Sequence, residues 1–440
     1  MKRPNILFIM ADQMAAPILP LHDAASPIQM PNLMRLAAEA VVFDAAYCNS
    51  PLCAPSRFTL VSGQLPSKIG AYDNAADFPA DVPTYAHYLR RLGYRTALSG
   101  KMHFCGPDQL HGYEERLTSD IYPADYGWAV NWDEPDVRPT WYHNMSSVLQ
   151  AGPCVRSNQL DFDEEVVFKA RQYLYDHVRE NDGRPFCLTV SMTHPHDPYT
   201  IPKPYQGKLP GDPGTVQHTI AYADIALRKF FETASKKPWF ENTVFVITGD
   251  HTSHSDKEYF YSQSGHYEVP VLVYSPGVNI SENLIQGQRK NNDDAVSLIP
   301  ESHASTTSPW AKNLVDSTIK IATQKTISQC DILPTVWSLL GSPNGKSNIQ
   351  PRLGFGRSAF DPNYPGYSTH FDKDLYYIIQ YPYVLALNQR GEVVDYHEQN
   401  RNQPKGTPLS QKGPQFEWMR ATLQSQMLEY SHRIRNNRWE

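Results

Sequence analysis

The sequence of 440 residues contains no apolar run of about eighteen residues, the length that a membrane-spanning helix needs. Its first residues combine two positive charges with a short apolar run that ends in an aspartate, and they lack the small-residue cleavage site of a signal peptide. The six cysteines form no C-x-x-C pair, which favours reduced thiols over a disulfide framework. The formal net charge of -6 argues against a nucleic-acid partner. These absences favour an ordinary globular protein of the cytoplasm, without a membrane span.

The sequence does contain a series of short, continuous apolar runs, which are typical of strands buried on both faces of a parallel sheet. Helical patterns separate most of these runs. The alternation predicts an α/β fold with a central, mostly parallel sheet flanked by helices. The predicted strands are residues 5–10, 94–99, 186–192, 243–248 and 269–274, and the predicted helices are residues 31–40, 82–92, 163–180, 216–236 and 327–340.

The sequence changes character toward its end. Short apolar stretches at 375–380, 383–387 and 391–396 have the spacing of hairpins, and an amphipathic helix is predicted for 417–435. We therefore predict two parts, a main α/β domain over residues 1–345 and a small α+β C-terminal subdomain over residues 346–440. The polar segment 279–308 is predicted to be a surface insertion.

Ionisable side chains follow the carboxyl ends of four predicted strands. Ligands of open α/β sheets bind beyond these ends. Each side chain taken alone also has an ordinary explanation, such as a helix cap or a solvated loop. Because four independent coincidences would be needed to explain the whole set, we predict that they form one site. In chain order the residues are Asp12, Lys101 and His103, His194 and His196, and Asp250 and His251.

A cysteine stands on a turn close to these strand ends. Cys53 lies between Pro51 and Pro55, which fix the turn, and Arg57 follows one helical turn later. A reactive cysteine needs an electropositive and partly exposed position, and Arg57 would supply the positive charge. A lone cysteine is also often a small buried hydrophobic residue. The residues alone leave both interpretations open.

The stretch Cys53-x-Pro55-Ser56-Arg57, followed by Gly63, resembles the signature of the type I sulfatases, which are members of the alkaline phosphatase superfamily. This resemblance implies an alkaline-phosphatase-like sulfatase fold. From residue 1 to about residue 205 the sequence is similar to choline sulfatases, as in 63–67, 98–103, 106–112 and 193–199. From about residue 199 onward it resembles the lipoteichoic acid synthase-like branch instead, as in 220–231 and 239–253.

The resemblance also implies a chemistry. In type I sulfatases a formylglycine-generating enzyme oxidises the cysteine, here Cys53, to formylglycine, whose hydrated aldehyde attacks sulfur. A divalent metal ion is expected beside it, with calcium first and manganese or magnesium as alternatives. The implied metal ligands are Asp12, Cys53, Asp250 and His251. The implied catalytic residues are Cys53, Arg57, Lys101, His103 and His196.

The implied substrate pocket contains Asn74, Trp128, His143, His194 and His266. Trp128 is a candidate for the cation-π contact that a quaternary ammonium group prefers. His266 is the best substitute for a sulfate-binding lysine of choline sulfatases, since Lys257 lies too early to match. Choline sulfatases contact substrate and neighbouring subunits through a C-terminal tail that this sequence does not match, so choline specificity is less firmly implied than the reaction class, and a homo-oligomer is a possible assembly.

The sequence therefore predicts a sulfuric ester hydrolase that acts on choline-O-sulfate or a related small alkyl sulfate. Two alternatives stay open. The second half of the sequence suggests a phosphoester hydrolase or phosphoglycerol transferase of the same superfamily. A chain whose two halves resemble different branches can also be a metal-binding pseudoenzyme without catalytic activity.

Overall fold

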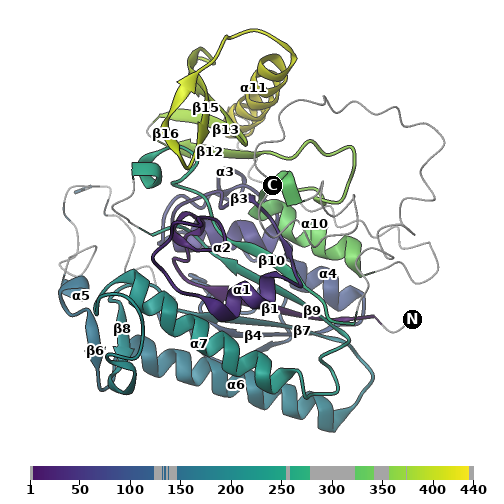
Figure 1. Ribbon diagram of the computed structural model, residues 1–440. Coiled ribbons are helices and arrows are strands. Elements are labelled where there is room, and N and C mark those ends of the chain that lie inside the picture. The colour runs from purple at the N-terminus through teal and green to yellow at the C-terminus, as the bar shows by residue number, and fades with distance from the viewer. Residues whose placement is uncertain are drawn as a thin grey trace.

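The structure is a computed structural model that describes residues 3–122, 131, 133–134, 137, 146–253, 258–277, 323–340, 356–372 and 374–435. Its centre is a seven-stranded sheet (Figure 1). Parallel pairing joins β9, β1, β7, β4 and β5, whereas β10 runs antiparallel to β9 and β2. In sheet order the strands are β2 (Val41–Val42), β10 (Val271–Tyr274), β9 (Thr243–Gly249), β1 (Asn5–Ala11), β7 (Phe186–Met192), β4 (Arg95–Gly100) and β5 (Glu115–Arg116).

The middle strand β1 supplies apolar side chains to both faces of the sheet. Ile6, Phe8 and Met10 belong to one apolar cluster, and Leu7 and Ile9 belong to another, as the two-residue period of a strand requires. Helices cover both clusters, and the two sets lie on opposite faces (Figure 1). The first set is α2 (Cys53–Ser62), α4 (Tyr85–Arg91) and α10 (Gln329–Leu339), and the second is α6 (Asn158–Glu180) and α7 (Val216–Ala234).

Helix α2 is buried along its whole length, from Cys53 to Ser62. The hydroxyl groups of Thr59 and Ser62 donate to the carbonyl oxygens four residues earlier, which satisfies them inside the core. The helix ends at Gly63, which has the left-handed φ of 67° that glycine adopts most readily. The burial of this helix fixes the position of its first residue, Cys53.

Several shorter elements complete the main part. A two-stranded sheet pairs β3 (Ala45–Tyr47) with β11 (Thr326–Ser328), so α10 begins only at Gln329 and the predicted helix start at residue 327 is wrong. A capping box formed by Ser328 and Asp331 marks the true start. The other elements are η1 (Ala16–Ile18), α1 (Pro31–Ala37), α3 (Pro66–Ile69), α5 (Ser146–Leu149), β6 (Gly152–Cys154), β8 (Thr200–Pro202), η2 (Lys203–Tyr205) and η3 (Glu258–Tyr261).

A five-stranded antiparallel sheet forms the C-terminal part, with α11 (Pro414–Arg435) packed on one face (Figure 1). The other face packs against Tyr47, Tyr267 and Val269 of the main part. The boundary predicted at residue 346 and the predicted insertion at 279–308 lie outside the described residues. The strands follow chain order: β12 (Ser368–Asp372), β13 (Leu375–Gln380), β14 (Tyr383–Asn388), β15 (Val393–Asn400) and β16 (Gln403–Pro408).

Among the described helices, none combines the length and the apolar character needed to cross a membrane. The α/β class with a mostly parallel central sheet, predicted from the apolar runs, is confirmed.

Candidate active site

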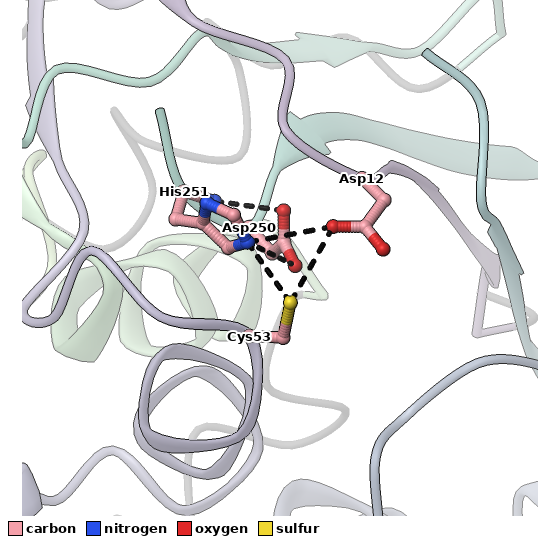
Figure 2. Close-up of side chains that lie close together, drawn as sticks. All are labelled: Asp12, Cys53, Asp250 and His251. Carbon is pink, nitrogen blue, oxygen red and sulfur yellow. Dashed lines mark hydrogen bonds and ion pairs between the residues drawn. The ribbon is translucent and has the colours of Figure 1, made fainter. Parts of the chain in front are cut away.

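Four of the side chains singled out in the sequence lie together at the carboxyl edge of the central sheet. Asp12 follows β1, Asp250 and His251 follow β9, and Cys53 is the first residue of α2. Figure 2 shows the four side chains pointing toward one another. One potential ligand atom of each lies within 4.8 Å of those of the other three, and all four residues are buried. The cluster therefore joins segments that are almost 240 positions apart in the chain.

The imidazole of His251 is oriented for this cluster. Its Nδ1 lies 2.8 Å from the carbonyl oxygen of Thr252, to which it donates, so Nε2 faces the other three side chains. Nε2 is 3.0 Å from Cys53 Sγ, 3.5 Å from Asp12 Oδ1 and 3.7 Å from Asp250 Oδ2. Cys53 Sγ is in turn 3.8 Å from Asp12 Oδ1.

The chemistry of these donors fits a divalent metal ion. Two carboxylates supply hard oxygen ligands, and an imidazole nitrogen is a common metal ligand. The sulfur of Cys53 marks the place where the oxygens of a formylglycine would stand. Burial and the negative charge of Asp12 raise the pKa of Asp250. A bound cation would relieve the repulsion between these two carboxylates. Asp12, Asp250, His251 and residue 53 are thus a candidate metal site.

Two buried cations border the cluster. The Lys101 ammonium group donates to Asp12 Oδ2 and lies 3.3 Å from Cys53 Sγ. Arg57 donates through Nε to Asp250 Oδ2 at 2.9 Å, and its Nη2 lies 3.6 Å from Asp12 Oδ2. Both side chains are almost fully excluded from solvent. Because each cation is hydrogen-bonded to a carboxylate, their positions are fixed before any substrate binds.

These neighbours set the ionisation of the cluster. Burial opposes ionisation of Cys53, but the charges of Lys101 and His251 hold the pKa of the thiol well below its usual range. For Asp12, burial and the Cys53 charge oppose ionisation, yet Lys101 and further cations lower its pKa to about 2. Burial opposes protonation of His251, and the Asp250 carboxylate raises its pKa to about 9. The cluster therefore favours negative oxygen and sulfur atoms beside fixed positive charge.

Two further histidines face the thiol. The side chains of His103 and His196 both contribute to the lowered pKa of Cys53, so both lie near the thiol. The main-chain N–H of His103 donates to Asp120 Oδ2 at 2.7 Å. Nδ1 of His196 lies 2.8 Å from the carbonyl oxygen of Asp197 and 3.2 Å from its Oδ1, which orients the ring. Both predicted proton carriers therefore lie beside the cluster.

His194, which follows the same strand as His196, is held elsewhere. Its Nδ1 lies 2.7 Å from Asp163 Oδ2, and its Nε2 lies 2.9 Å from the carbonyl oxygen of Thr200. Burial opposes its protonation, but the hydrogen bond and charge of Asp163 raise its pKa. Because both ring nitrogens bind protein acceptors, His194 supports the loop after β7 instead of facing the cluster.

The other predicted substrate residues also have distinct positions. Asn74 Oδ1 accepts the N–H of Ala54 at 3.0 Å and so caps α2, whose N-cap residue Leu52 has no capping side-chain bond. The carbonyl oxygen of His266 accepts a 2.7 Å hydrogen bond from Thr252, the residue after His251. Trp128 and His143 lie outside the described residues.

Sequence reasoning missed several supporting residues. Nη1 of Arg57 donates to Ser191 Oγ at 2.7 Å, and the Gln329 amide donates to the Asp250 carbonyl oxygen at 2.6 Å. Ser191 could have been found from the sequence, since it is a polar residue in a mostly apolar strand. Gln329 carried none, because only the packing of α10 against α2 brings it near Asp250.

Solved structures share this fold. A protein of the alkaline phosphatase superfamily from Vibrio parahaemolyticus has a TM-score of 0.62 and 17% identity, over 100% of this chain and 89% of that one. The structure of yidJ from Bacteroides fragilis has a TM-score of 0.62 and 16% identity, over 98% of this chain and 97% of that one. The fold is that of the alkaline-phosphatase-like sulfatases.

The chain belongs to the sulfatase family, which it matches over residues 4–342. It is 39% identical over 325 residues to the choline-sulfatase of Rhizobium meliloti (strain 1021), an alignment that covers 63% of this chain. The chain spans 63% of the length of that protein. The predicted resemblance to type I sulfatases is confirmed at the level of the family.

Proposed function

We propose that this chain is a sulfuric ester hydrolase that releases sulfate from choline-O-sulfate or a related small alkyl sulfate. The observation that carries the proposal is the buried cluster of Asp12, Cys53, Asp250 and His251, with the Lys101 ammonium 3.3 Å from Cys53 Sγ. The similarity to a choline-sulfatase supports the choice of ester.

Asp12, Asp250 and His251 would hold a divalent cation together with residue 53, with calcium as the first candidate because carboxylate oxygens are the ligands it prefers. The ion would supply stabilisation of negative charge, and a formylglycine made from Cys53 would supply the nucleophilic hydroxyl group. Gln13 and His251 keep Asp250 in place, since their main-chain N–H groups donate to its Oδ1 at 2.9 and 2.8 Å.

Arg57 and Lys101 bring fixed positive charge to the position of the transferring group. The Arg57 guanidinium is held by Asp250 and Ser191, so it cannot rearrange easily. Lys101 reaches Cys53 directly and is the group best placed to stabilise charge that builds on the sulfuryl oxygens. Fixed donors of this kind stabilise a transition state more than a ground state because they need no reorganisation.

The two histidines that face residue 53 would act on the protons and on the transferring group. His103 is the proposed donor to the leaving alcohol, and its imidazole, neutral after that transfer, is the proposed base that takes a proton from the hydroxyl group of residue 53. Asp197 binds Nδ1 of His196, which leaves the Nε2 side of this ring to donate to the transferring group.

The proposal is tested with the purified full-length chain, coexpressed with a formylglycine-generating enzyme. Intact mass measures conversion of Cys53, which removes about 18 Da. The converted protein is then assayed with choline-O-sulfate, other alkyl and aryl sulfates, and the matching phosphate esters, with Cys53→Ala as the control. We expect sulfate release from choline-O-sulfate, with sulfate esters turned over faster than phosphate esters.

A converted protein with bound metal that hydrolyses none of the sulfate esters would overturn the proposal. Faster turnover of the phosphate esters would support the alternative of a phosphoester hydrolase. Bound metal without conversion of Cys53 would instead indicate the metal-binding pseudoenzyme.

A further inference from the structure

The segment after β5 lies beside the main chain that carries Lys101 and His103. The N–H of Leu117 donates to the carbonyl oxygen of Leu98 at 2.7 Å, and the N–H of Gly100 donates to Thr118 Oγ1 at 2.9 Å. These bonds continue the parallel pairing of β5 with β4. The residues that follow Thr118 therefore reach the carboxyl end of β4, where the site begins.

Asp120 fixes the main chain beyond the last residue of β4. The N–H groups of Met102 and His103 both donate to its Oδ2, at 2.9 and 2.7 Å, and Nη2 of Arg116 lies 3.0 Å from the same oxygen. The Asp120 side chain is 3% exposed, and a charged acceptor in such surroundings forms strong hydrogen bonds. His103 has a φ of 60°, which residues other than glycine rarely adopt. Asp120 thus holds a main-chain conformation that would not persist without support.

Tyr122 contacts the side chains of the same segment. Its ring centroid lies 4.6 Å from the Lys101 ammonium nitrogen, and its ring lies 5.0 Å from the ring of His103. The same ammonium group binds Asp12 and reaches Cys53. A lysine side chain is a flexible four-carbon stem, and an aromatic face that attracts its charge restricts where that charge can go. The Tyr122 ring therefore helps to hold the ammonium group at the cluster.

We propose that Asp120 and Tyr122 are positioning residues for Lys101 and His103, with Asp120 acting on the main chain and the ring of Tyr122 on the side chains. This inference rests on the proposed function for what Lys101 and His103 do in turnover. Lys101 acts on charge that develops in the transition state, so loss of its position lowers kcat and leaves KM nearly unchanged. The hydroxyl group of Tyr122 is not required.

The kinetic test uses Tyr122→Leu and Tyr122→Phe in the full-length converted protein, with choline-O-sulfate as substrate. We expect Tyr122→Leu to lower kcat at least about tenfold with KM changed less than about threefold, whereas Tyr122→Phe recovers at least about a third of the wild-type kcat. Tyr175→Leu on α6 is the matched control, because the Tyr175 ring lies 5.1 Å from the Lys237 ammonium nitrogen. That change should leave both constants as they are.

Asp120 is tested in the same way with a conservative pair. Asp120→Asn keeps an oxygen that accepts the N–H groups of Met102 and His103, so its kcat should stay close to that of the wild type. Asp120→Ala lacks this oxygen and should have a much lower kcat. Should Asp120→Ala fail to fold, the Tyr122 pair decides the inference, since Tyr122 is only half-buried and its removal leaves the core intact.

A second measurement needs no activity. The Lys101 side chain is 1% exposed, so an amine-acetylating reagent should modify it slowly, as followed by peptide mass spectrometry with Lys237 as the internal reference. Tyr122→Leu should raise the acetylation rate of Lys101 at least about fivefold, and Tyr122→Phe should not, because only the former removes the ring.

Wild-type kcat and wild-type acetylation in Tyr122→Leu would overturn the inference. Equal losses in Tyr122→Phe and Tyr122→Leu would overturn it as well, because the hydroxyl group would then be the part that matters. If the converted wild-type protein hydrolyses no sulfate ester, the proposed function fails, and the acetylation series alone decides whether Tyr122 positions Lys101.

Discussion

In the central sheet, β1, β4, β7 and β9 run parallel, so the residues that follow them meet at one edge. In the C-terminal sheet every neighbouring pair from β12 to β16 is antiparallel, so successive strands end at opposite edges. Over the described residues, the single group of three or more metal-ligand side chains is at the parallel edge. Parallel pairing therefore gathers side chains from distant parts of the sequence, whereas the antiparallel meander separates them.

The C-terminal sheet instead supports the main part. Its inner face, which includes Ile379 and Val384, packs against Tyr267 and Val269. Arg401, just after β15, forms an ion pair with the buried Glu268 and donates to main-chain carbonyl oxygens of the main part. The two sheets are expected to respond differently to substitution, in activity at one and in stability at the other.

The largest expected effect is that of Cys53→Ala, which removes the side chain of the proposed nucleophile at the first residue of α2. We expect kcat to fall at least about a thousandfold, as loss of a nucleophile does in other hydrolases, with the circular dichroism spectrum unchanged. Cys154→Ala in β6, outside the cluster, is the control and should keep full activity. Residual activity of Cys53→Ala within tenfold of wild type would contradict the site.

Removal of the metal should have the next largest effect. Chelation should lower activity at least about a hundredfold and lower the melting temperature, because Asp12 and Asp250 then repel each other and binding no longer favours the folded state. Added calcium should reverse both changes. The pair Asp395 and His397 in β15, 2.9 Å apart, provides the comparison, and Asp395→Asn should change neither response. An activity that survives exhaustive chelation would argue against a metal at the parallel edge.

Arginines paired with buried carboxylates at the two sheets provide the third contrast. Arg57→Met removes the arginine partner of Asp250, and Arg401→Met removes that of Glu268. Each change should lower the free energy of unfolding by about 3–5 kcal/mol, the cost of an unpaired buried charge. Urea denaturation measures this loss. Only Arg57→Met should also abolish turnover, so an active Arg57→Met enzyme would remove Arg57 from the proposed mechanism.

The most gradual expected effect, small at each pH step, concerns Asp331 of α10. Its carboxylate accepts hydrogen bonds from the N–H groups of Ser328 and Arg357 and from the Tyr364 hydroxyl, yet burial outweighs them and raises its pKa to about 7. The folded state then holds a proton that the unfolded state releases near its ordinary pKa of about 3.9. The stability that this group contributes is therefore present below about pH 4 and is lost as the pH rises to about 7, on the order of 1 kcal/mol per pH unit.

Urea midpoints measured across this pH range test the assignment. Asp331→Asn should flatten the slope, whereas Asp395→Asn, a half-exposed control in β15, should leave it as in wild type. Identical slopes for wild type and Asp331→Asn would show that Asp331 does not titrate in this way.

The strands that carry the site could be predicted because each is a continuous apolar run with a polar residue at its end, as in β1 before Asp12 and β9 before Asp250. The strand β16 could not, because Pro404, Gly406 and Pro408 have low strand propensity and the strand is defined by its pairing with β15.

The cluster itself could be predicted from the ionisable residues that follow the strands, but the roles of the neighbouring residues could not. Asn74, expected in the substrate pocket, caps α2, and His194 binds Asp163 and Thr200. Nothing in the sequence marks Asp120 as a support for His103, because the contact depends on how the segment after β5 lies beside β4. Side-chain partners of this kind are fixed by packing, which a single sequence does not specify.

Burial of α2 has a consequence for the biosynthesis of the protein. Cys53 is only 5% exposed, and its helix is enclosed by the sheet, α10 and α4. The active site of a modifying enzyme cannot reach a thiol in this position unless α2 leaves the core. Under the proposed function, oxidation of Cys53 would therefore have to take place on the nascent or unfolded polypeptide, and a chain that folds first would stay in the thiol form.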